Sequence, residues 1–361
     1  MYHSIIVGFG LAGLCYALQL QKRNKTFLII NHPSIKGASL ISSGLCNPFN
    51  FKRYTLAWRA TDFFSYAKEF FLSHEQQIGM SILRQMPIYK QLDSIGEWNL
   101  WQSKCDQPFF HSFFEDQILK NECSYQSRGS EYGVVRCTFQ IDLELVFDHF
   151  LQSLEEKTYV KEIFDSDELH TDEIKVTYKQ WTSQHIVFCQ GYGLKSNPLT
   201  HRFPLVGNKG EILMITSDAI PNNQILKSKV YVIPLVSKNH FWVGATFDRE
   251  SKSMQPTSTS KQKLMDDLNQ SMDVDFHIVS HQAQIRPTMI DRRPLLGKIP
   301  NQSRAFVFNG LGTRGIMMAP LLSQWLYQHI EGNVALPQEI ATDRFHSMEK
   351  ESNASSRCCP C

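Results

Sequence analysis

The hydrophobic pattern at the start of the chain predicts a strand, a helix and a second strand in quick succession. An apolar run over residues 4–7 leads into glycines, apolar positions at helical spacing follow from Leu11 to Leu18, and a second apolar run covers residues 27–30. Two apolar strands joined by a helix within about 30 residues are typical of a βαβ unit with parallel strands. We therefore predict an α/β layer that begins with this segment.

A similar order of elements occurs near the other end of the chain. An apolar run over residues 305–308 leads into a turn with three glycines and then into a predicted helix over residues 316–330. Another apolar run, over residues 186–189, follows a short predicted hairpin and also ends at a glycine turn. Because the free N–H groups at a helix N-terminus attract negative charge, the chain offers two helix ends to an electron-rich ligand.

The glycines of the first segment follow the spacing G-x-G-x-x-G. In this motif Gly8 permits the tight turn, Gly10 lets the backbone approach a pyrophosphate, and Gly13 lets the helix pack on the strand. Asn31 ends the second strand, where an acidic residue would bind the ribose hydroxyls, and its amide oxygen is a weaker acceptor than a carboxylate. We predict dinucleotide binding, with an unphosphorylated ribose because no arginine follows Asn31 directly.

Composition and charge exclude several classes of protein. The 361 residues are 42% hydrophobic and 20% charged, which suits two folded domains rather than a disordered chain. The net charge of +2 lacks the basic excess that is typical of nucleic-acid-binding proteins. No apolar run reaches the roughly 18 residues that span a bilayer, and no leader pattern precedes the first strand, so we expect a cytoplasmic protein.

The nine cysteines show no C-x-x-C spacing. Six are scattered singly through regular segments, and we expect them to be reduced thiols. The other three, Cys358, Cys359 and Cys361, lie in a polar tail over residues 346–361. We expect a disordered terminus there in preference to a soft-metal site, and the sequence predicts no metal site elsewhere.

Seven segments in sequence order resemble the D-amino-acid oxidase family of FAD-dependent oxidoreductases. They read G-F-G-L-A-G, A-S-L-I-S-S-G-L-C-N-P, F-C-Q-G-Y-G, N-K-G-E, Y-V-I-P followed by V-G-A-T-F-D, I-R-P-T-M-I-D-R-R-P-L-L-G, and F-N-G-L-G-T-R-G-I-M-M-A-P. Within the family, their order and spacing most resemble glycine oxidase and the C-terminal FAD domain of the bifunctional enzyme that makes methylaminomethyl-uridine in tRNA. The resemblance covers about residues 3–345 and is weak over residues 70–130.

The resemblance implies FAD held non-covalently by a Rossmann-like domain, beside a substrate domain built on an antiparallel sheet. The expected fold class is therefore an α/β cofactor layer combined with an α+β substrate domain. Both domains are discontinuous: residues 1–75, 130–200 and 285–345 are expected to form the FAD-binding domain, and residues 76–129 and 201–284 the substrate domain.

The cofactor-binding positions of the family can be matched one by one. The resemblance implies that the dinucleotide motif, the ribose position, the loop beside the flavin ring and the two later glycine turns contact FAD. These positions are Gly8, Gly10, Leu11, Ala12, Gly13, Asn31, Ala38, Ser39, Gly44, Leu45, Gly191, Gly312, Thr313, Arg314, Gly315 and Ile316. The match departs from the family where Cys189 and Gln190 replace the usual Ala-Thr before Gly191.

The substrate chemistry implied by the resemblance depends on Arg286. This residue matches the family arginine that holds the substrate carboxylate through two hydrogen bonds. The alternative is an ion pair with Asp291 or another acidic residue that stabilises its loop. Arg314 is either a gate at the flavin face or an ion-pair partner, and Tyr231 either contacts the substrate or packs on its strand. Lys209 either assists oxygen reduction near the flavin or is a solvated strand lysine, and we favour the solvated lysine.

The implied reaction is oxidation of the C–N bond of an amino acid or secondary amine, with hydride transfer to flavin N5. The imine then hydrolyses, and dioxygen or another acceptor reoxidises the flavin. We expect a small-molecule substrate and no membrane partner. Two alternatives stay open: oxidation of a carboxymethylamino group on tRNA, and a flavin-binding protein without amine oxidase turnover.

Two further segments have their own predictions. The aromatic-rich stretch over residues 76–130 forms either a local core, which we favour, or the wall of a pocket for a larger substrate; its aromatic residues are Trp98, Trp101, Phe109, Phe110, Phe113 and Phe114. The polar residues 249–263 predict an exposed loop that leads into a helix over residues 261–271.

Overall fold

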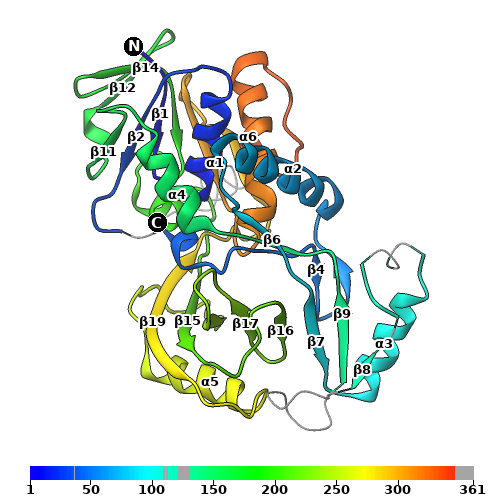
Figure 1. Ribbon diagram of the computed structural model, residues 1–361. Coiled ribbons are helices and arrows are strands. Elements are labelled where there is room, and N and C mark those ends of the chain that lie inside the picture. The colour runs from blue at the N-terminus through cyan, green and yellow to red at the C-terminus, as the bar shows by residue number, and fades with distance from the viewer. Residues whose placement is uncertain (36, 109, 111–112, 117, 121–130, 346–361) are drawn as a thin grey trace, which may run out of the picture. The chain divides into compact units, whose positions relative to one another are not determined.

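The computed structural model describes the chain except for residues 36, 109, 111–112, 117, 121–130 and 346–361. Contacts divide the chain into two compact units, each assembled from segments that are far apart in the sequence (Figure 1). Unit 1 comprises Met1–Leu40, Phe147–Asn208 and Arg286–Cys361, and unit 2 comprises Ile41–Val146 and Lys209–Ile285.

These unit boundaries differ from the domain boundaries expected from the sequence. Residues 41–75 and 130–146 belong to unit 2, and residues 201–208 belong to unit 1. The pairing of short strands gives the physical reason, because β10 (Phe139–Ile141) lies between β3 (Leu45–Cys46) and β6 (Leu83–Gln85) in one three-stranded sheet. The cysteine-rich tail, residues 346–361, lies outside the described residues.

Unit 1 is built on an eight-stranded sheet. Six strands follow one another in the order β11 (Tyr159–Lys161), β2 (Phe27–Asn31), β1 (Tyr2–Val7), β14 (Trp181–Phe188), β13 (Val176–Tyr178) and β12 (Leu169–Thr171). In addition, β21 (Ala305–Asn309) pairs with β14, and β20 (Leu295–Lys298) pairs with β21. The pairs β1–β2, β1–β14 and β14–β21 are parallel, which confirms the predicted α/β layer.

Two long helices begin at the predicted glycine turns of unit 1. Helix α1 (Leu11–Gln21) connects β1 to β2, and α6 (Gly315–Gly332) follows β21; the two helices lie side by side (Figure 1). The remaining elements are α4 (Leu143–Gln152), η1 (Ala38–Ile41), η2 (Ser166–Glu168), η3 (Gly191–Ser196) and η4 (Thr342–Phe345). Of these, α4 and η1 cross the boundary between the units.

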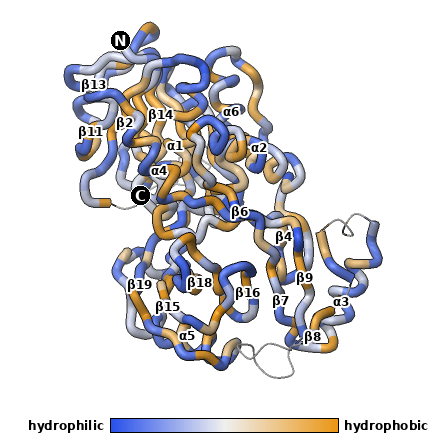
Figure 2. Tube along the Cα trace, in the orientation of Figure 1, coloured by the Kyte–Doolittle hydropathy of each residue, from blue (hydrophilic) through white to orange (hydrophobic). Residues whose placement is uncertain are grey.

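Alternation along the strands separates the two faces of this sheet. Ile5 and Val7 join a core cluster with residues of β2, β14 and β21 on one face, whereas Ile6 contacts Gly13 of α1 on the other. Figure 2 shows the apolar character of β2 and β14. Strands that are apolar on both faces are typical of a parallel sheet covered on both sides.

Unit 2 contains the second large sheet. Its eight strands follow the order β19 (His277–Arg286), β15 (Asn208–Thr216), β18 (His240–Gly244), β17 (Tyr231–Pro234), β16 (Ile225–Lys227), β7 (Ile88–Leu92), β9 (Glu131–Val135) and β8 (Leu119–Lys120). The sheet is largely antiparallel, as expected, but β16 and β7 run parallel. A hairpin of β4 (Phe49–Asn50) and β5 (Thr55–Leu56) and the helices α2 (Ala60–Ile78), α3 (Ile95–Cys105) and α5 (Ser258–Asn269) complete the unit.

The aromatic-rich segment largely forms core, as favoured from the sequence. Trp101, Phe110 and Phe114 are buried in one cluster, and Phe113 packs against it, whereas Trp98 is 38% exposed. Phe109 lies outside the described residues. The predicted loop over residues 249–263 is shorter than expected, because the side chain of Thr257 accepts a hydrogen bond from the Ser260 N–H and caps α5 at Ser258.

Two further expectations concern the state of the cysteines and the presence of a membrane-spanning helix. Cys15, Cys46, Cys105, Cys137 and Cys189 form no disulfide among the described residues, whereas Cys123 and the three tail cysteines lie outside those residues. Within the described ranges, no helix has both the length and the apolar character needed to cross a bilayer.

Candidate cofactor and substrate site

The three motif glycines have different physical roles in unit 1. Gly8 has φ +98°, and a Cβ there would lie 2.6 Å from the Cys189 carbonyl oxygen. A Cβ on Gly13 would lie 2.2 Å from the Gly8 carbonyl oxygen, so packing of the chain itself requires both glycines. A Cβ on Gly10 would meet only Ser39 Oγ at 3.5 Å, which is ordinary contact. The glycine at position 10 therefore fits close approach by a ligand rather than an internal packing need.

The N-terminus of α1 is bounded by two side-chain hydrogen bonds. The Leu11 N–H donates to Ser39 Oγ at 3.0 Å, and the Phe9 N–H donates to Asn31 Oδ1 at 3.0 Å. Gly10 caps the helix without a side chain. Ser39, which comes from η1 together with Ala38, is thereby held at the positive end of the helix dipole.

Asn31 has a defined orientation because a backbone N–H can only donate. Its Oδ1 accepts from Phe9, and its Nδ2 therefore donates to the Tyr159 hydroxyl at 2.8 Å. An amide in this arrangement keeps one acceptor site and one N–H for a ribose. Tyr159 lies far from Asn31 in the sequence, and no motif indicated it.

The glycine turn that precedes α6, from Gly310 to Gly315, contacts the segment that contains Arg286. Gly312 has φ +55°, and its N–H donates to the Pro287 carbonyl oxygen at 2.8 Å. At the start of α6, a Cβ on Gly315 would lie 3.2 Å from Leu11 Cδ2, so the first residues of α6 and α1 lie close together. The structure thus brings both predicted helix N-termini and the Arg286 segment together within unit 1.

The residues around these turns have different exposure. Thr313 is exposed, Arg314 is partly buried at the cap of α6, and Ile316 is buried. Gly191 has φ +57° and open space where a Cβ would lie. Leu11 and Ala12, in the first turn of α1, are buried.

Asn309 connects two of the turns and was missed from the sequence. Its Nδ2 donates to the Gly191 carbonyl oxygen at 3.0 Å, and its Oδ1 accepts from the Gly310 N–H at 2.7 Å. It is buried at the carboxyl end of β21, where an open α/β sheet usually binds its ligand. In the sequence, the signal that could have indicated a role for Asn309 was its position directly before the glycine turn.

Arg286 ends β19 at the start of the last segment of unit 1 and is partly exposed. Burial lowers the pKa of its guanidinium to about 10, so the group is charged at neutral pH. Asp291, the expected alternative partner, is contacted by Arg344, with Nε 2.8 Å from Oδ2. Asp291 Oδ1 also accepts from the Arg293 N–H. Asp291 therefore has partners other than Arg286.

Three predicted site residues belong to unit 2. A Cβ on Gly44 would lie 2.0 Å from the Ile141 carbonyl oxygen, so the packing of the chain itself requires this glycine. Leu45 of β3 pairs with Gln140 of β10. Tyr231 on β17 is partly buried, with the Lys227 ammonium 4.7 Å from its ring centroid. Tyr231 also packs against the surrounding apolar cluster.

Lys209 corrects a prediction, because it is not a solvated lysine. Its side chain is 1% exposed, lies 3.0 Å from Glu211 Oε1 and donates to the Gln255 carbonyl oxygen at 2.6 Å. Burial by itself raises the pKa of Glu211, but hydrogen bonds from Thr257 and Lys209 lower it overall. A buried charge is tolerated only with such partners, and β15 lies inside its sheet rather than at an edge.

A pocket of about 360 Å³ lies within unit 2, beside the start of α2. Phe64, Phe113 and Phe139 are among its walls, and Lys68 and Glu69 also line it. The aromatic-rich segment therefore contributes Phe113 to a pocket wall as well as forming a core.

The sequence model of the family described as FAD dependent oxidoreductase matches residues 3–329. The chain belongs to this family. It is accordingly an FAD-dependent oxidoreductase, and its cofactor is FAD. The glycines at positions 8, 10 and 13 of this family member fit a dinucleotide, because packing explains two of them and leaves the third open to a ligand.

Individual relatives agree with the family assignment. The chain is 24% identical over 371 aligned residues to the tRNA 5-methylaminomethyl-2-thiouridine biosynthesis bifunctional protein MnmC of Idiomarina loihiensis, an alignment that covers 94% of this chain and 58% of that protein. The chain thus spans little more than half the length of this relative.

Two solved structures share the fold of this family member. Iminodiacetate oxidase from Chelativorans sp. BNC1 aligns with a TM-score of 0.74 and 14% identity, covering 94% of this chain and 98% of the other. Glycine oxidase from Bacillus cereus aligns with a TM-score of 0.74 and 17% identity, covering 93% and 96%. At these identities the likeness establishes the fold, which is the expected α/β cofactor layer with an antiparallel substrate domain.

Proposed function

We propose that the chain oxidises the C–N bond of a small amino acid or secondary amine that carries a carboxylate. The observation that carries this proposal is the position of Arg286, whose segment is hydrogen-bonded to the glycine turn of α6 through Gly312 and Pro287. The names of two structural neighbours, iminodiacetate oxidase and glycine oxidase, support the same substrate class.

Arg286 would bind the substrate carboxylate. A planar guanidinium presents two parallel N–H groups to a carboxylate, and it fixes the orientation of the substrate as well as its charge. Because the pKa of Arg286 is about 10, the cation persists at neutral pH. Holding the reacting C–H bond in one orientation supplies several kcal/mol of the barrier reduction, on the order found for well-oriented reactants. Tyr231 is retained as a second substrate contact.

When bound, FAD supplies the two-electron acceptor for the C–H bond next to the substrate nitrogen. Residues at the start of α6, Gly312 to Ile316, would stabilise negative charge through their N–H groups and the helix dipole. The turn at Gly191 is assigned to the same cofactor. No side-chain base is required if the amine binds in its neutral form.

The remaining contacts to FAD are assigned to the first half of the chain. Gly10, Leu11, Ala12 and the dipole of α1 would hold the pyrophosphate, and Asn31 the ribose. Ala38, Ser39, Gly44 and Leu45 are assigned to the neighbourhood of the flavin ring. The cofactor is proposed to be held without a covalent bond.

A second candidate is oxidation of a carboxymethylamino group on tRNA. The similarity to the bifunctional tRNA protein over 94% of this chain favours it, and it would use the same arginine. The near-neutral charge of the chain favours a small substrate instead, because RNA binding usually needs a basic surface.

The test is anaerobic mixing of the FAD-loaded protein with glycine, N-alkyl glycines and iminodiacetate, while the visible flavin absorbance is followed. We expect at least one of these compounds to bleach the flavin. If only tRNA that carries a carboxymethylamino group bleaches it, the second candidate is correct. If the protein retains FAD and neither class reduces it, the chain binds flavin without amine oxidation.

A further inference from the structure

The backbone hydrogen bonds at the start of β1 depart from the regular ladder. The N–H groups of His3 and Ser4 both donate to the Thr26 carbonyl oxygen, at 2.9 and 3.3 Å, whereas successive N–H groups of a regular strand point to opposite sides of it. Instead of alternating, both side chains lie on the face that α1 and α6 cover. Ser4 Oγ lies 3.3 Å from the Tyr16 hydroxyl of α1, and the His3 ring stacks on Tyr327 of α6.

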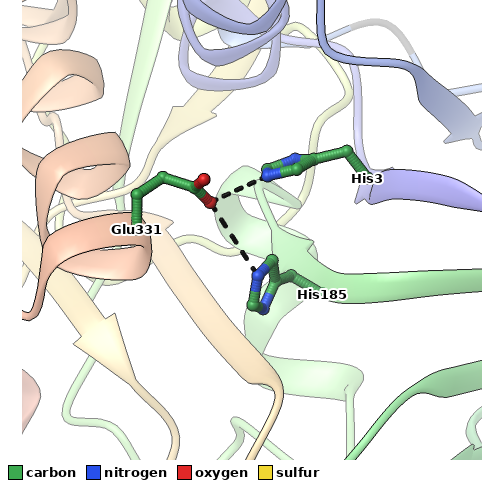
Figure 3. Close-up of side chains that lie close together, drawn as sticks. All are labelled: His3, His185 and Glu331. Atoms are coloured by element: carbon green, nitrogen blue, oxygen red, sulfur yellow. Dashed lines mark hydrogen bonds and ion pairs between the residues drawn. The ribbon is translucent and has the colours of Figure 1, made fainter.

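This arrangement places His3 beside two other potential metal ligands. His185 is paired with Ser4 across the β1–β14 ladder, and Glu331 lies near the end of α6. Glu331 Oε1 lies 2.8 Å from His3 Nε2 and 4.0 Å from His185 Nε2 (Figure 3). One donor atom from each of the three residues lies within 4.8 Å of the other two.

The two histidines are buried, whereas the Glu331 side chain is 28% exposed. Among the described residues, His185 Nδ1 has no hydrogen-bond partner, and its Nε2 is beyond hydrogen-bond distance of the carboxylate. A buried nitrogen without a hydrogen-bond partner is destabilising. His185 Nε2, on the other side of the ring, faces Glu331 and can bind a metal ion there.

His3 already has the outer contact that a metal-binding histidine usually makes. Its Nδ1 lies 3.0 Å from Ser4 Oγ, which can accept that N–H and donate its own proton to Tyr16. In this tautomer His3 Nε2 carries a lone pair that can bind a metal ion, whereas in the other tautomer Nε2 donates its proton to Glu331 Oε1 at 2.8 Å.

We propose that His3, His185 and Glu331 bind a divalent transition-metal ion of the zinc type. Two imidazoles and one carboxylate suit Zn²⁺ rather than Mg²⁺ or Ca²⁺, which prefer oxygen ligands. A tetrahedral site holds its donor atoms roughly 3.4 Å apart. The observed separations of 2.8 and 4.0 Å lie on either side of that value, and the partly exposed Glu331 can rotate to equalise them.

The position of this site indicates a structural role. It lies at the beginning of β1, whereas the glycine motif follows the end of that strand, and it would join β1, β14 and α6. The Lys25 ammonium lies 3.6 Å from the second oxygen of Glu331 and would orient the carboxylate while Oε1 binds the metal. The fourth coordination position would hold water, as in other sites with three protein ligands.

The test measures zinc binding by calorimetry on the FAD-loaded full-length chain after dialysis against a chelator. The background carries Cys358→Ser, Cys359→Ser and Cys361→Ser, because these thiols would also bind zinc. We expect one Zn²⁺ per chain and no heat from Mg²⁺. His185→Ala and Glu331→Gln should abolish this binding, whereas the control His170→Ala, at an exposed histidine of the same unit, should leave it unchanged.

A milder variant keeps the test decisive if the histidine variants fold poorly. Ser4→Ala removes the outer contact of His3 and should weaken zinc binding by about 10- to 100-fold while leaving both histidines in place. Circular dichroism and FAD content verify the fold of each variant. The proposal is overturned if zinc does not bind in the background without the three tail cysteines, or if it binds equally well to His185→Ala, Ser4→Ala and His170→Ala. The three side chains would then form an ion-paired cluster only.

Discussion

Replacement of Arg286 by alanine removes the proposed anchor of the substrate carboxylate. Each hydrogen bond between charged groups contributes about 1.5–3 kcal/mol, and truncating one partner of a buried charge pair costs about 2–5 kcal/mol. Loss of both hydrogen bonds to the carboxylate therefore places the cost at about 3–5 kcal/mol. At about 1.4 kcal/mol per tenfold change, a loss of 3–5 kcal/mol corresponds to a fall of roughly 10²- to 10⁴-fold in kcat/KM.

The assay is anaerobic stopped-flow reduction of the bound flavin by the best substrate. Arg286→Ala should keep its FAD, and Arg286→Lys should recover part of the rate because it retains the charge but loses the paired N–H groups. Arg202→Ala, at an exposed arginine of the same unit, is the matched control. A variant without Arg286 that reduces its flavin within threefold of the wild-type rate would refute the role of this residue as carboxylate anchor.

Three further predictions concern the cofactor motif and a buried ion pair. Gly13→Ala should prevent stable folding, because its Cβ would lie 2.2 Å from the Gly8 carbonyl oxygen. Gly10→Ala should instead keep the melting temperature and weaken FAD binding at least about tenfold. Equal effects of the two variants in thermal melts and FAD titrations would contradict the different roles assigned to these glycines. Asn31→Asp should tighten FAD binding severalfold, since a carboxylate is the stronger ribose acceptor, and unchanged or weaker binding would mean that the ribose does not contact this position. Glu211→Gln should destabilise the protein by about 3–5 kcal/mol in urea denaturation at pH 7, because it leaves the Lys209 ammonium buried without its counter-ion. The pKa of Glu211 is lowered in the folded state. Glu211 therefore contributes fully to the free energy of unfolding above the carboxyl pKa of the unfolded chain, about 4.3, and this contribution falls as the pH decreases below that pKa. A wild-type free energy of unfolding that stays constant as the pH falls below about 4.3 would contradict this expectation.

The parts of the fold that depend on local pattern could be predicted from the sequence. The apolar runs, the glycines and the helical spacing all lie within about 30 residues, and their meaning depends on backbone geometry rather than on distant partners. For the same reason α1 and α6 begin within a residue or two of the glycine turns that predicted them.

Contacts between distant segments could not be predicted. The hydrogen bonds of Asn31 to Tyr159 and of Asn309 to Gly191 depend on strand order, which periodicity does not encode. Lys209 was expected to be solvated, although its partner Glu211 lies only two residues away, because the burial of both depends on the place of β15 inside its sheet.

The cluster of His3, His185 and Glu331 could not be predicted from the sequence either. It depends on the irregular backbone at the start of β1 and on the packing of α6, and neither leaves a motif in the sequence.

We propose that this FAD-dependent oxidoreductase acts on a small amine through its carboxylate. The most direct measurement compares anaerobic flavin reduction by an N-alkyl glycine or iminodiacetate with reduction by the matching esters, which lack the negative charge. The account predicts bleaching by the free acids and a loss of at least about 100-fold in rate for the esters. Equal reduction by acids and esters, or no reduction by any carboxylated amine, would contradict it.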